Sequence, residues 1–342
     1  MKKLLAAALA MGISFGVNAE TWKFATEEDK KDVQDIFART FADTIKKESD
    51  GDIRVKVYYY GQLGTENDIV ELTAKGTVQF VSVGTGHLGS YVPEVQAISV
   101  PYVMGTETDS VRKVLTGSKT IYNDLADRFE NVNLKLLTMI SEGEMVWGAN
   151  KAIRSPEDFA NQKIRTFTST IPVETYKAFG ATPTPLSWGE VYGSLQLKTV
   201  DGMVNPIYFI YNAKWHEVQD YLMFPGQQPY VGTVSTNSKW FNKLSAEKQA
   251  MVHKAIDAAE QAAHDYQLKI NKENMDKIMA ERPDMKVVVL NKAERERFKQ
   301  LSSSLHETYY KVVESAYDDK AAARARAEKI LQNLIKEVED AS

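Results

Sequence analysis

The stretch from Lys163 to Pro206 contains three residue types that could together bind an organic anion. Arg165 lies in a predicted strand, and its guanidinium group presents paired N–H donors that match the two oxygens of a carboxylate. Asn205 offers an amide donor and acceptor, although Asn followed by proline is also a common turn signal. Trp188 lies at the predicted start of a helix, where backbone N–H groups favour anions. These residue types suit capture of a carboxylate.

Signatures of catalysis are missing from the sequence. It contains no Walker-type phosphate loop, no GxGxxG after a strand, no GxSxG elbow and no HExxH. Cysteine is absent, which excludes a cysteine nucleophile and a thiolate metal site. The five histidines are scattered without metal-ligand spacing. We therefore expect a protein that is not an enzyme and that needs no metal and no cofactor.

The N-terminus has the pattern of a secretory signal peptide. Two lysines at positions 2 and 3 precede an apolar run over residues 4–17, and small residues then lead to a cleavage site after Ala19. The apolar run is too short to span a bilayer comfortably. We therefore expect a periplasmic protein without membrane insertion, whose mature chain begins at Glu20. Its 323 residues (342 minus 19) are enough for two domains.

The charge balance limits the possible partners. Removing the two N-terminal lysines takes the formal net charge from −4 to −6 and leaves no basic tract. Nucleic acids and anionic membrane surfaces attract basic surfaces, so neither is expected to be a partner.

The periodicity of apolar residues changes along the chain as it does in α/β proteins. Strands are predicted over residues 22–26, 53–59, 78–83, 163–167 and 287–290. Helices are predicted over residues 29–47, 65–75, 173–179, 188–197 and from Ser245 to about Ala280. Alternating strands and helices predict βαβ units and a largely parallel sheet.

No flexible Gly/Ser linker separates the predicted units, which favours a hinged clamshell that the chain crosses several times. We expect one α/β lobe to contain residues 20–142 and 231–270. The other α/β lobe is expected to contain residues 143–230 and 271–342, including the C-terminal helices.

Several motifs, in the same order, resemble the substrate-binding proteins of tripartite ATP-independent periplasmic (TRAP) transporters, the DctP-type family. They read KIR at 163–165, GATPTP at 180–185, EVYGSLQ at 190–196 and VDGMVNP at 200–206. Supporting matches are GQLG at 61–64, VPYV at 100–103 and SPEDF at 155–159. The resemblance covers nearly the whole mature chain, although residues beyond about 315 are less typical.

The resemblance implies two lobes that are joined by strands and a long helix and that close over a small organic acid. The closed protein would deliver this solute to the TRAP membrane subunits. Arg165 would hold the substrate carboxylate, with Asn205, Trp188 and Phe209 beside it. In the first lobe Glu27 would meet an ammonium or hydroxyl group of the ligand, because carboxylates repel each other. Further candidate contacts are Glu66, Gly84, Thr85 and His87.

The resemblance leaves the ligand open. Sialic-acid binders carry a second arginine before the residue equivalent to Ser155, but this chain reads GEMVW at 143–147, which leaves Met145 or Trp147 as a possible pocket wall. A sugar acid, a hydroxy or keto acid, an amino acid or a compatible solute remains possible. The alternatives are a binding protein for another transporter class or a sensor, a secreted enzyme acting on an organic acid, and a structural envelope protein.

Overall fold

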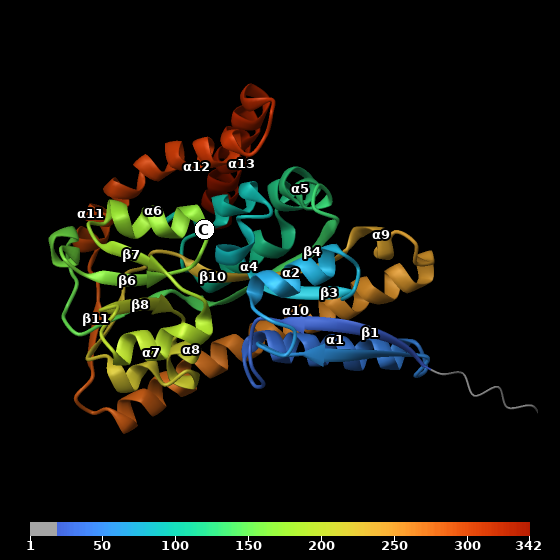
Figure 1. The fold of residues 1–342 in the computed structure, drawn as a ribbon, viewed down its shortest axis with the longest axis horizontal. Helices are drawn as coiled ribbons and strands as arrows, with labels where there is room; N and C mark the ends of the chain where they lie inside the picture. The colour runs from blue at the N-terminus through green and yellow to red at the C-terminus, as the bar shows by residue number, and fades with distance from the viewer. Residues whose placement is uncertain (1–18) are drawn as a thin grey trace, which may run out of the picture.

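The computed structural model describes residues 19–342 (Figure 1). The predicted signal peptide, apart from Ala19, therefore lies outside the described residues, and its cleavage remains a prediction. The first strand, β1 (Glu20–Thr26), begins at the predicted mature N-terminus. Among residues 19–342, no helix is long and apolar enough to cross a membrane.

The strands form two sheets, one in each lobe. The five-stranded sheet of the first lobe has the order β2 (Ile53–Tyr58), β1, β3 (Phe80–Gly84), β10 (Pro229–Asn237) and β4 (Leu134–Glu144). The six-stranded sheet of the second lobe has the order β11 (Lys286–Val289), β9 (Tyr221–Phe224), β5 (Val146–Ala149), β8 (Gly202–Asn205), β6 (Lys163–Thr166) and β7 (Thr182–Pro185).

Each sheet contains one strand that runs against all the others. In the first sheet this strand is β10, which pairs antiparallel with β3 and β4, and in the second it is β5, which pairs antiparallel with β8 and β9. Both strands follow a crossing of the chain, from β4 into β5 and from β9 into β10. An incoming strand starts at the edge that faces the other lobe, whereas its neighbours end there. The largely parallel sheets expected from the sequence are therefore confirmed, with this one exception in each lobe.

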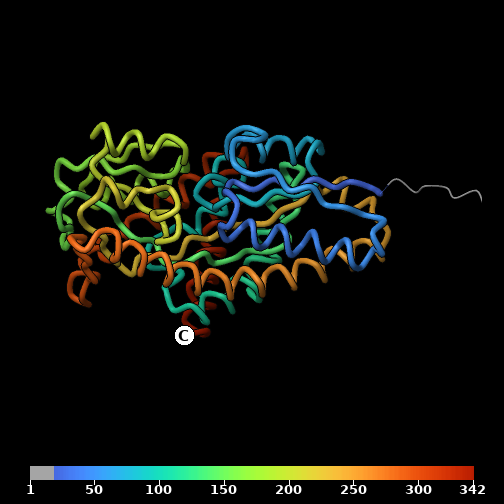
Figure 2. The backbone as a smooth tube through the Cα atoms, turned by 90° about the horizontal axis from the view of Figure 1, so that it is seen from below, coloured from blue at the N-terminus to red at the C-terminus, as the bar shows by residue number. Residues whose placement is uncertain are grey.

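The long helix α10 (Ala246–Glu281) joins the two lobes. The Ser245 hydroxyl caps its first turn by accepting a hydrogen bond from the Lys248 N–H at 3.3 Å. The helix packs on α1 (Val33–Glu48) and β4 of the first lobe and on α8 (Ile207–Asn212) of the second. It runs beneath both lobes in Figure 2. Its 36 residues correspond to about 54 Å, enough to span both lobes.

The remaining elements cover the sheets and connect the strands. The shorter α-helices are α2 (Glu66–Ala74), α3 (Thr85–Leu88), α4 (Thr108–Gly117), α5 (Ala126–Glu130), α6 (Thr170–Ala178), α7 (Val191–Gln196) and α9 (Ser238–Phe241). Short 3-10 helices are η1 (Pro93–Ser99), η3 (Pro156–Phe159), η4 (Trp188–Glu190) and η5 (Trp215–Val218), and η2 (Thr120–Leu125) is a short π-helix.

The C-terminal helices are α11 (Lys292–Ser302), α12 (Ser304–Ser315) and α13 (Lys320–Ala341). The last of them, α13, packs on α4, η1 and η2 of the first lobe. Arg326 on α13 donates a hydrogen bond from Nε to the buried Glu94 carboxylate at 2.9 Å. This packing differs from the expected place of residues 271–342 in the second lobe, because the apolar face of α13 completes the core of the first. The other predicted lobe boundaries remain predictions.

Replacing Leu331 with alanine tests whether α13 belongs to this core. Leu331 is fully buried, so Leu331→Ala should lower the free energy of unfolding by about 2–5 kcal/mol, measured by urea denaturation. The control is Leu197→Ala, because Leu197 is 75% exposed and its truncation removes little buried surface. Equal stability of the two variants would contradict a structural role for α13.

Candidate functional site

Two side chains of the second lobe meet at neighbouring strand ends. Arg165 lies near the end of β6, and Asn205 is the last residue of β8, its parallel neighbour. Because parallel neighbours end at the same sheet edge, residues 40 positions apart become adjacent. The Arg165 Nη1 donates a hydrogen bond to Asn205 Oδ1 at 2.9 Å. The two main candidates from the sequence therefore form one group.

Arg165 is fully buried and strongly oriented. Its Nε and Nη2 donate to the Leu186 carbonyl at 3.1 and 2.9 Å, and its guanidinium carbon lies 4.7 Å from the centre of the Phe167 ring. Burial lowers the pKa of Arg165 to about 10, so the group is still a cation at neutral pH. Within residues 19–342 no carboxylate lies within 4.0 Å of it. Protein acceptors in the described chain take three of the five guanidinium N–H groups, which leaves two for a ligand.

Glu27 supplies a carboxylate from the first lobe, directly after β1. Its Oε1 accepts hydrogen bonds from the Gly84 N–H at 2.6 Å, the Tyr230 hydroxyl at 2.5 Å and the Gln34 amide at 3.2 Å. Its Oε2 is buried and has no hydrogen-bond partner among the described residues. Burial raises the pKa of Glu27 to about 8, although the Tyr230 hydrogen bond opposes the shift. The free oxygen is well suited to a cationic or hydroxyl group.

Aromatic rings surround these polar groups. Trp188 lies edge-on to Tyr60 with ring centres 5.3 Å apart, and it lies 6.5 Å from Phe209. Tyr230 lies 5.5 Å from Phe209 and 5.7 Å from Phe167. The rings come from both lobes, so they form a shared apolar lining around Arg165 and Glu27.

The two lobes are closed on each other around this group. Glu66 Oε1 of the first lobe accepts a hydrogen bond from the Trp188 N–H at 3.1 Å, and the Tyr60 hydroxyl accepts one from the Gly189 N–H at 3.2 Å. On another side, the Ser169 N–H donates to the Gly86 carbonyl at 3.1 Å. A capping box between Ser187 and Glu190 forms the turn that places the backbone N–H groups of Trp188 and Gly189 toward the first lobe.

The weaker first-lobe candidates lie close to the same group. Gly84 approaches Tyr230 and Glu27 so closely that an added Cβ would collide with the Tyr230 hydroxyl. His87 packs edge-on to Phe167 at 5.2 Å, and burial lowers its pKa to about 4, so it is neutral at pH 7. Thr85 lies beside Ser99, with 3.3 Å between their hydroxyl oxygens.

The two candidates before Ser155 are core residues. Trp147 packs against Phe159, Phe179 and Phe298, with ring centres 5.0, 6.2 and 5.1 Å away. Its indole N–H donates to Gln227 rather than facing Arg165. Met145 is buried in the same apolar cluster. Trp147 is therefore not a pocket wall here, and a ligand contact by Met145 remains a prediction.

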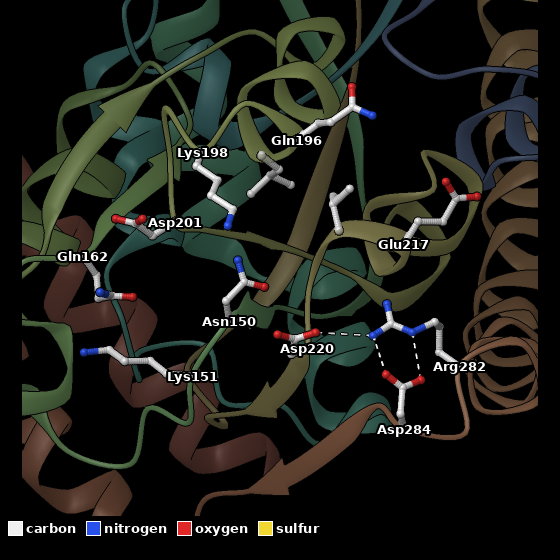
Figure 3. A pocket seen from close by; sticks show the side chains of 12 residues that line it. Asn150, Lys151, Gln162, Gln196, Lys198, Asp201, Glu217, Asp220, Arg282 and Asp284 are labelled. Carbon is white, nitrogen blue, oxygen red and sulfur yellow. Dashed lines mark hydrogen bonds and ion pairs between the residues drawn. The ribbon is translucent and has the colours of Figure 1, made fainter.

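A large open pocket lies elsewhere on the second lobe (Figure 3). It has a volume of about 820 Å³ and is lined by polar side chains before β6, β8 and β9, including Asp201 and Asp220. These residues lie at the sheet edge opposite Arg165. Arg282, its most prominent cation, is bound to Asp284 at 2.8 Å and Asp220 at 3.4 Å. This pocket is therefore separate from the group around Arg165.

Comparison with known proteins agrees with this geometry. Residues 24–312 match the family described as bacterial extracellular solute-binding protein, family 7 (DctP). The chain belongs to this family. The resemblance indicated by the motifs is thereby confirmed, and the two-lobed α/β fold class is confirmed with it.

Two family members and one solved structure show the degree of similarity. The ectoine-binding periplasmic protein TeaA of Halomonas elongata is 39% identical over 302 residues, 88% of each chain. The ectoine/5-hydroxyectoine-binding periplasmic protein UehA of Ruegeria pomeroyi is 37% identical over 317 residues, 93% of this chain and 92% of that protein. The structure of the ectoine-binding protein from the TeaABC TRAP transporter of Halomonas elongata matches with a TM-score of 0.87 and 36% identity. It covers 94% of this chain and 100% of that chain.

Several residues around Arg165 and Glu27 were not predicted from the sequence. Tyr230 contacts Glu27, Tyr60 contacts Trp188, and the Leu186 carbonyl contacts Arg165, yet none of the three was predicted. Tyr230 lies at the start of β10, where the chain enters the first lobe at the edge facing the second. Recognising that crossing strand in the sequence would have singled out its first residues.

The close approach at Gly84 can be tested by adding one methyl group. Gly84→Ala should lower the free energy of unfolding by about 1–3 kcal/mol, because Tyr230 must move away from Glu27 to make room. Thermal unfolding followed by circular dichroism measures this change. The control is Gly193→Ala in α7, where no atom lies within 4 Å of the added Cβ and a helical alanine stabilises by about 0.4–1 kcal/mol. Unchanged stability of Gly84→Ala would contradict the tight packing of Tyr230 on Gly84.

Proposed function

We propose that this protein captures a compact zwitterion, a solute with a carboxylate at one end and a delocalised cation at the other, and that ectoine is its ligand. The observation that carries the proposal is the pairing of Arg165 with Glu27 inside one closed, aromatic site. Arg165 has two free N–H donors, and Glu27 has one buried oxygen without a partner in the described chain. A zwitterion satisfies both groups at once.

Charge complementarity favours this class over a simple organic acid. Burial raises the pKa of Glu27 to about 8, so Glu27 stays protonated at neutral pH beside a ligand that carries only carboxylates. A cationic ligand group beside Glu27 favours the ionised carboxylate and pairs with it. Ligands with two carboxylates lack such a group.

The aromatic lining supports a flat, delocalised cation. Rings attract cations over their faces, and Trp188 and Phe209 lie on the second lobe while Tyr230 lies on β10 of the first. Ectoine is a small ring with a carboxylate and an amidinium cation. Both TeaA and UehA, at 39% and 37% identity, carry ectoine binding in their names.

Capture of the solute serves its uptake into the cell rather than its chemical conversion. The lobes close over the solute, because contacts from both lobes are available only in the closed state. The closed protein works in the periplasm and delivers its ligand to the membrane subunits of a TRAP transporter, in keeping with its family and its relatives. The ligand leaves unchanged.

Isothermal titration calorimetry with four ring solutes tests the proposal. Ectoine and 5-hydroxyectoine carry both charges on the ring, proline carries a localised ammonium, and pyroglutamate carries a carboxylate only. We expect ectoine to bind most tightly and pyroglutamate most weakly. Arg165→Ala should weaken ectoine binding at least about thirtyfold, since truncating one partner of a buried charge pair costs about 2–5 kcal/mol.

The role of Glu27 has its own variant and control. Glu27→Gln keeps the shape but removes the charge, so it should weaken ectoine binding more than pyroglutamate binding. Glu71→Gln is the matched control, because Glu71 is exposed and forms an ion pair with Lys75 at 2.7 Å on the surface of the first lobe. Equal binding of pyroglutamate and ectoine would contradict the zwitterion, and no binding of any of the four would contradict the proposed ligand class.

A further inference from the structure

Three carboxylates lie buried where the two lobes meet the long helix. Glu28 follows β1, Asp32 precedes α1, and Glu142 lies near the end of β4, where the chain crosses to the second lobe. All three are buried, and we call them the hinge cluster. Glu28, Asp32 and Glu142 take no part in the ligand contacts described above.

The hydrogen bonds of the hinge cluster cannot all be made without an additional proton. The Tyr208 hydroxyl lies 2.7 Å from Glu28 Oε1 and 2.5 Å from Glu142 Oε2. One hydroxyl carries one proton and cannot donate fully to both carboxylates. A proton held by Glu28 or Glu142 resolves the conflict.

No cation neutralises the hinge cluster within residues 19–342. None of its carboxylates lies within 4.0 Å of a lysine, arginine or histidine nitrogen. The titratable and charged groups that act on it are Glu27 and Asp29 beside β1, Tyr208 on α8, Tyr230 on β10, and Tyr266 on α10. The open pocket beside Asp32 is also lined by further charged and titratable groups: Lys30, Lys31, Tyr211, Lys214, His216, Glu217 and Glu281. The nearest polar groups of α10 and α8 are the amides of Asn271 and Asn212, which do not titrate. Burying several unpaired negative charges together is costly, and protonation removes that cost.

The hinge cluster connects both lobes to the proposed ligand contacts around Arg165 and Glu27. Tyr208 comes from the second lobe and stacks on Phe209, with ring centres 4.3 Å apart. Gln34 comes from the first lobe and donates from one amide nitrogen toward Glu142 Oε1 at 3.1 Å and Glu27 Oε1 at 3.2 Å. Asn271 of α10 donates to the Glu142 carbonyl at 2.9 Å and accepts from the Tyr208 N–H at 3.1 Å. Movement of one lobe against the other must therefore break contacts of these carboxylates.

Protons can reach the hinge cluster from solvent. Asp32 lines an open pocket of about 470 Å³ between the lobes, together with Asn212 and Trp188. The Asn212 amide donates to the Asp32 carboxylate across the lobe boundary.

We propose that the hinge cluster takes up protons as the lobes close, so that ligand capture is proton-linked and weakens as the pH rises. When the lobes close, Tyr208 and Asn212 contact the carboxylates, and the carboxylates lose their contact with water. When the lobes open, water hydrates the carboxylates again. Of the two experiments described below, the one that measures ligand binding rests on the proposed function, whereas the one that measures lobe closure uses no ligand.

The direction of the pH dependence follows from the closed structure. Burial raises the pKa of Glu28 well above its usual range, with the Glu142 charge adding to the shift, and burial raises the pKa of Asp32 to about 7. In the hydrated open state these acids ionise near their ordinary values of about 4. Protonated groups therefore stabilise the closed state fully below about pH 4, and this stabilisation is lost progressively as the pH rises from there through about 7.

The first experiment follows closure without ligand. The chain has no cysteine, so Lys56→Cys on β2 and Leu197→Cys after α7 introduce one label on each lobe. Distances between the two labels are measured by pulsed electron spin resonance from pH 5.5 to pH 9, as chosen test conditions on both sides of the pKa of about 7 for Asp32. We expect the distance distribution to shift from closed to open as the pH rises. A distribution that does not change with pH overturns the proposal.

The second experiment counts protons during binding of ectoine. Calorimetry at pH 7 in buffers with different ionisation enthalpies should show net proton uptake by the protein, and the dissociation constant should rise by up to about tenfold per pH unit for each linked proton. Zero or negative uptake with ectoine bound overturns the proposal. If ectoine does not bind, the proposed ligand fails, and the distance measurement still decides this inference.

Glutamine variants test whether the pH dependence comes from the hinge cluster or from the proposed ligand contacts around Arg165 and Glu27. Glu28→Gln keeps a hydrogen-bond donor but cannot ionise, so it should reduce both the proton uptake and the pH-dependent opening. Glu142→Gln serves the same purpose if Glu28→Gln does not fold, and Glu71→Gln is the exposed control that should behave as the wild type. Full pH dependence in a folded Glu28→Gln and Glu142→Gln protein overturns the assignment to this cluster.

Discussion

A single buried cation governs the arrangement of this protein. The Arg165 guanidinium is fully enclosed, yet no carboxylate of the described chain lies within 4.0 Å. Carbonyl, amide and aromatic groups hold it in place instead, so it remains charged and oriented toward the closed interface. Burying an unpaired charge is costly, and the cost is met by the rest of the fold. The closed lobes and the aromatic rings enclose this cation, and hydrogen bonds to Leu186 and Asn205 fix its orientation.

Strand direction explains why the polar groups converge. Four of the five strands in the first sheet, and five of the six in the second, end at the edge facing the other lobe. Side chains that follow a strand, such as Glu27 after β1, or that end one, such as Asn205 in β8, are thereby aimed into the interface. The single incoming strand of the first sheet brings Tyr230 to the same edge from the opposite direction. One topological rule therefore brings residues from distant parts of the chain together at the interface between the lobes.

Local signals in the sequence were sufficient for the elements that were predicted and for the pairing of Arg165 with Asn205. The helix after Thr65, the helix after Ser245 and the strand that contains Arg165 all depend on neighbours within a few residues. The KIR and NP motifs identified Arg165 and Asn205, which the structure joins directly. Tyr230, Tyr60 and the Leu186 carbonyl could not be found in this way, because each becomes relevant only through tertiary packing. Trp147 shows the same limit, since a tryptophan near a predicted cleft and one in a core look alike in sequence.

The position of α13 has a consequence for how the chain matures. The first lobe begins with Glu20, but its sheet is completed by β10 and its core by Ile330, Leu331 and Leu334 near the other end. Neither β1 to β4 nor the helices around them can bury their apolar surface until almost the entire polypeptide is available. Contacts between such distant segments form slowly, because the long loops between them must close first. The native core of the first lobe is therefore complete only when the last helix of the chain is available to it.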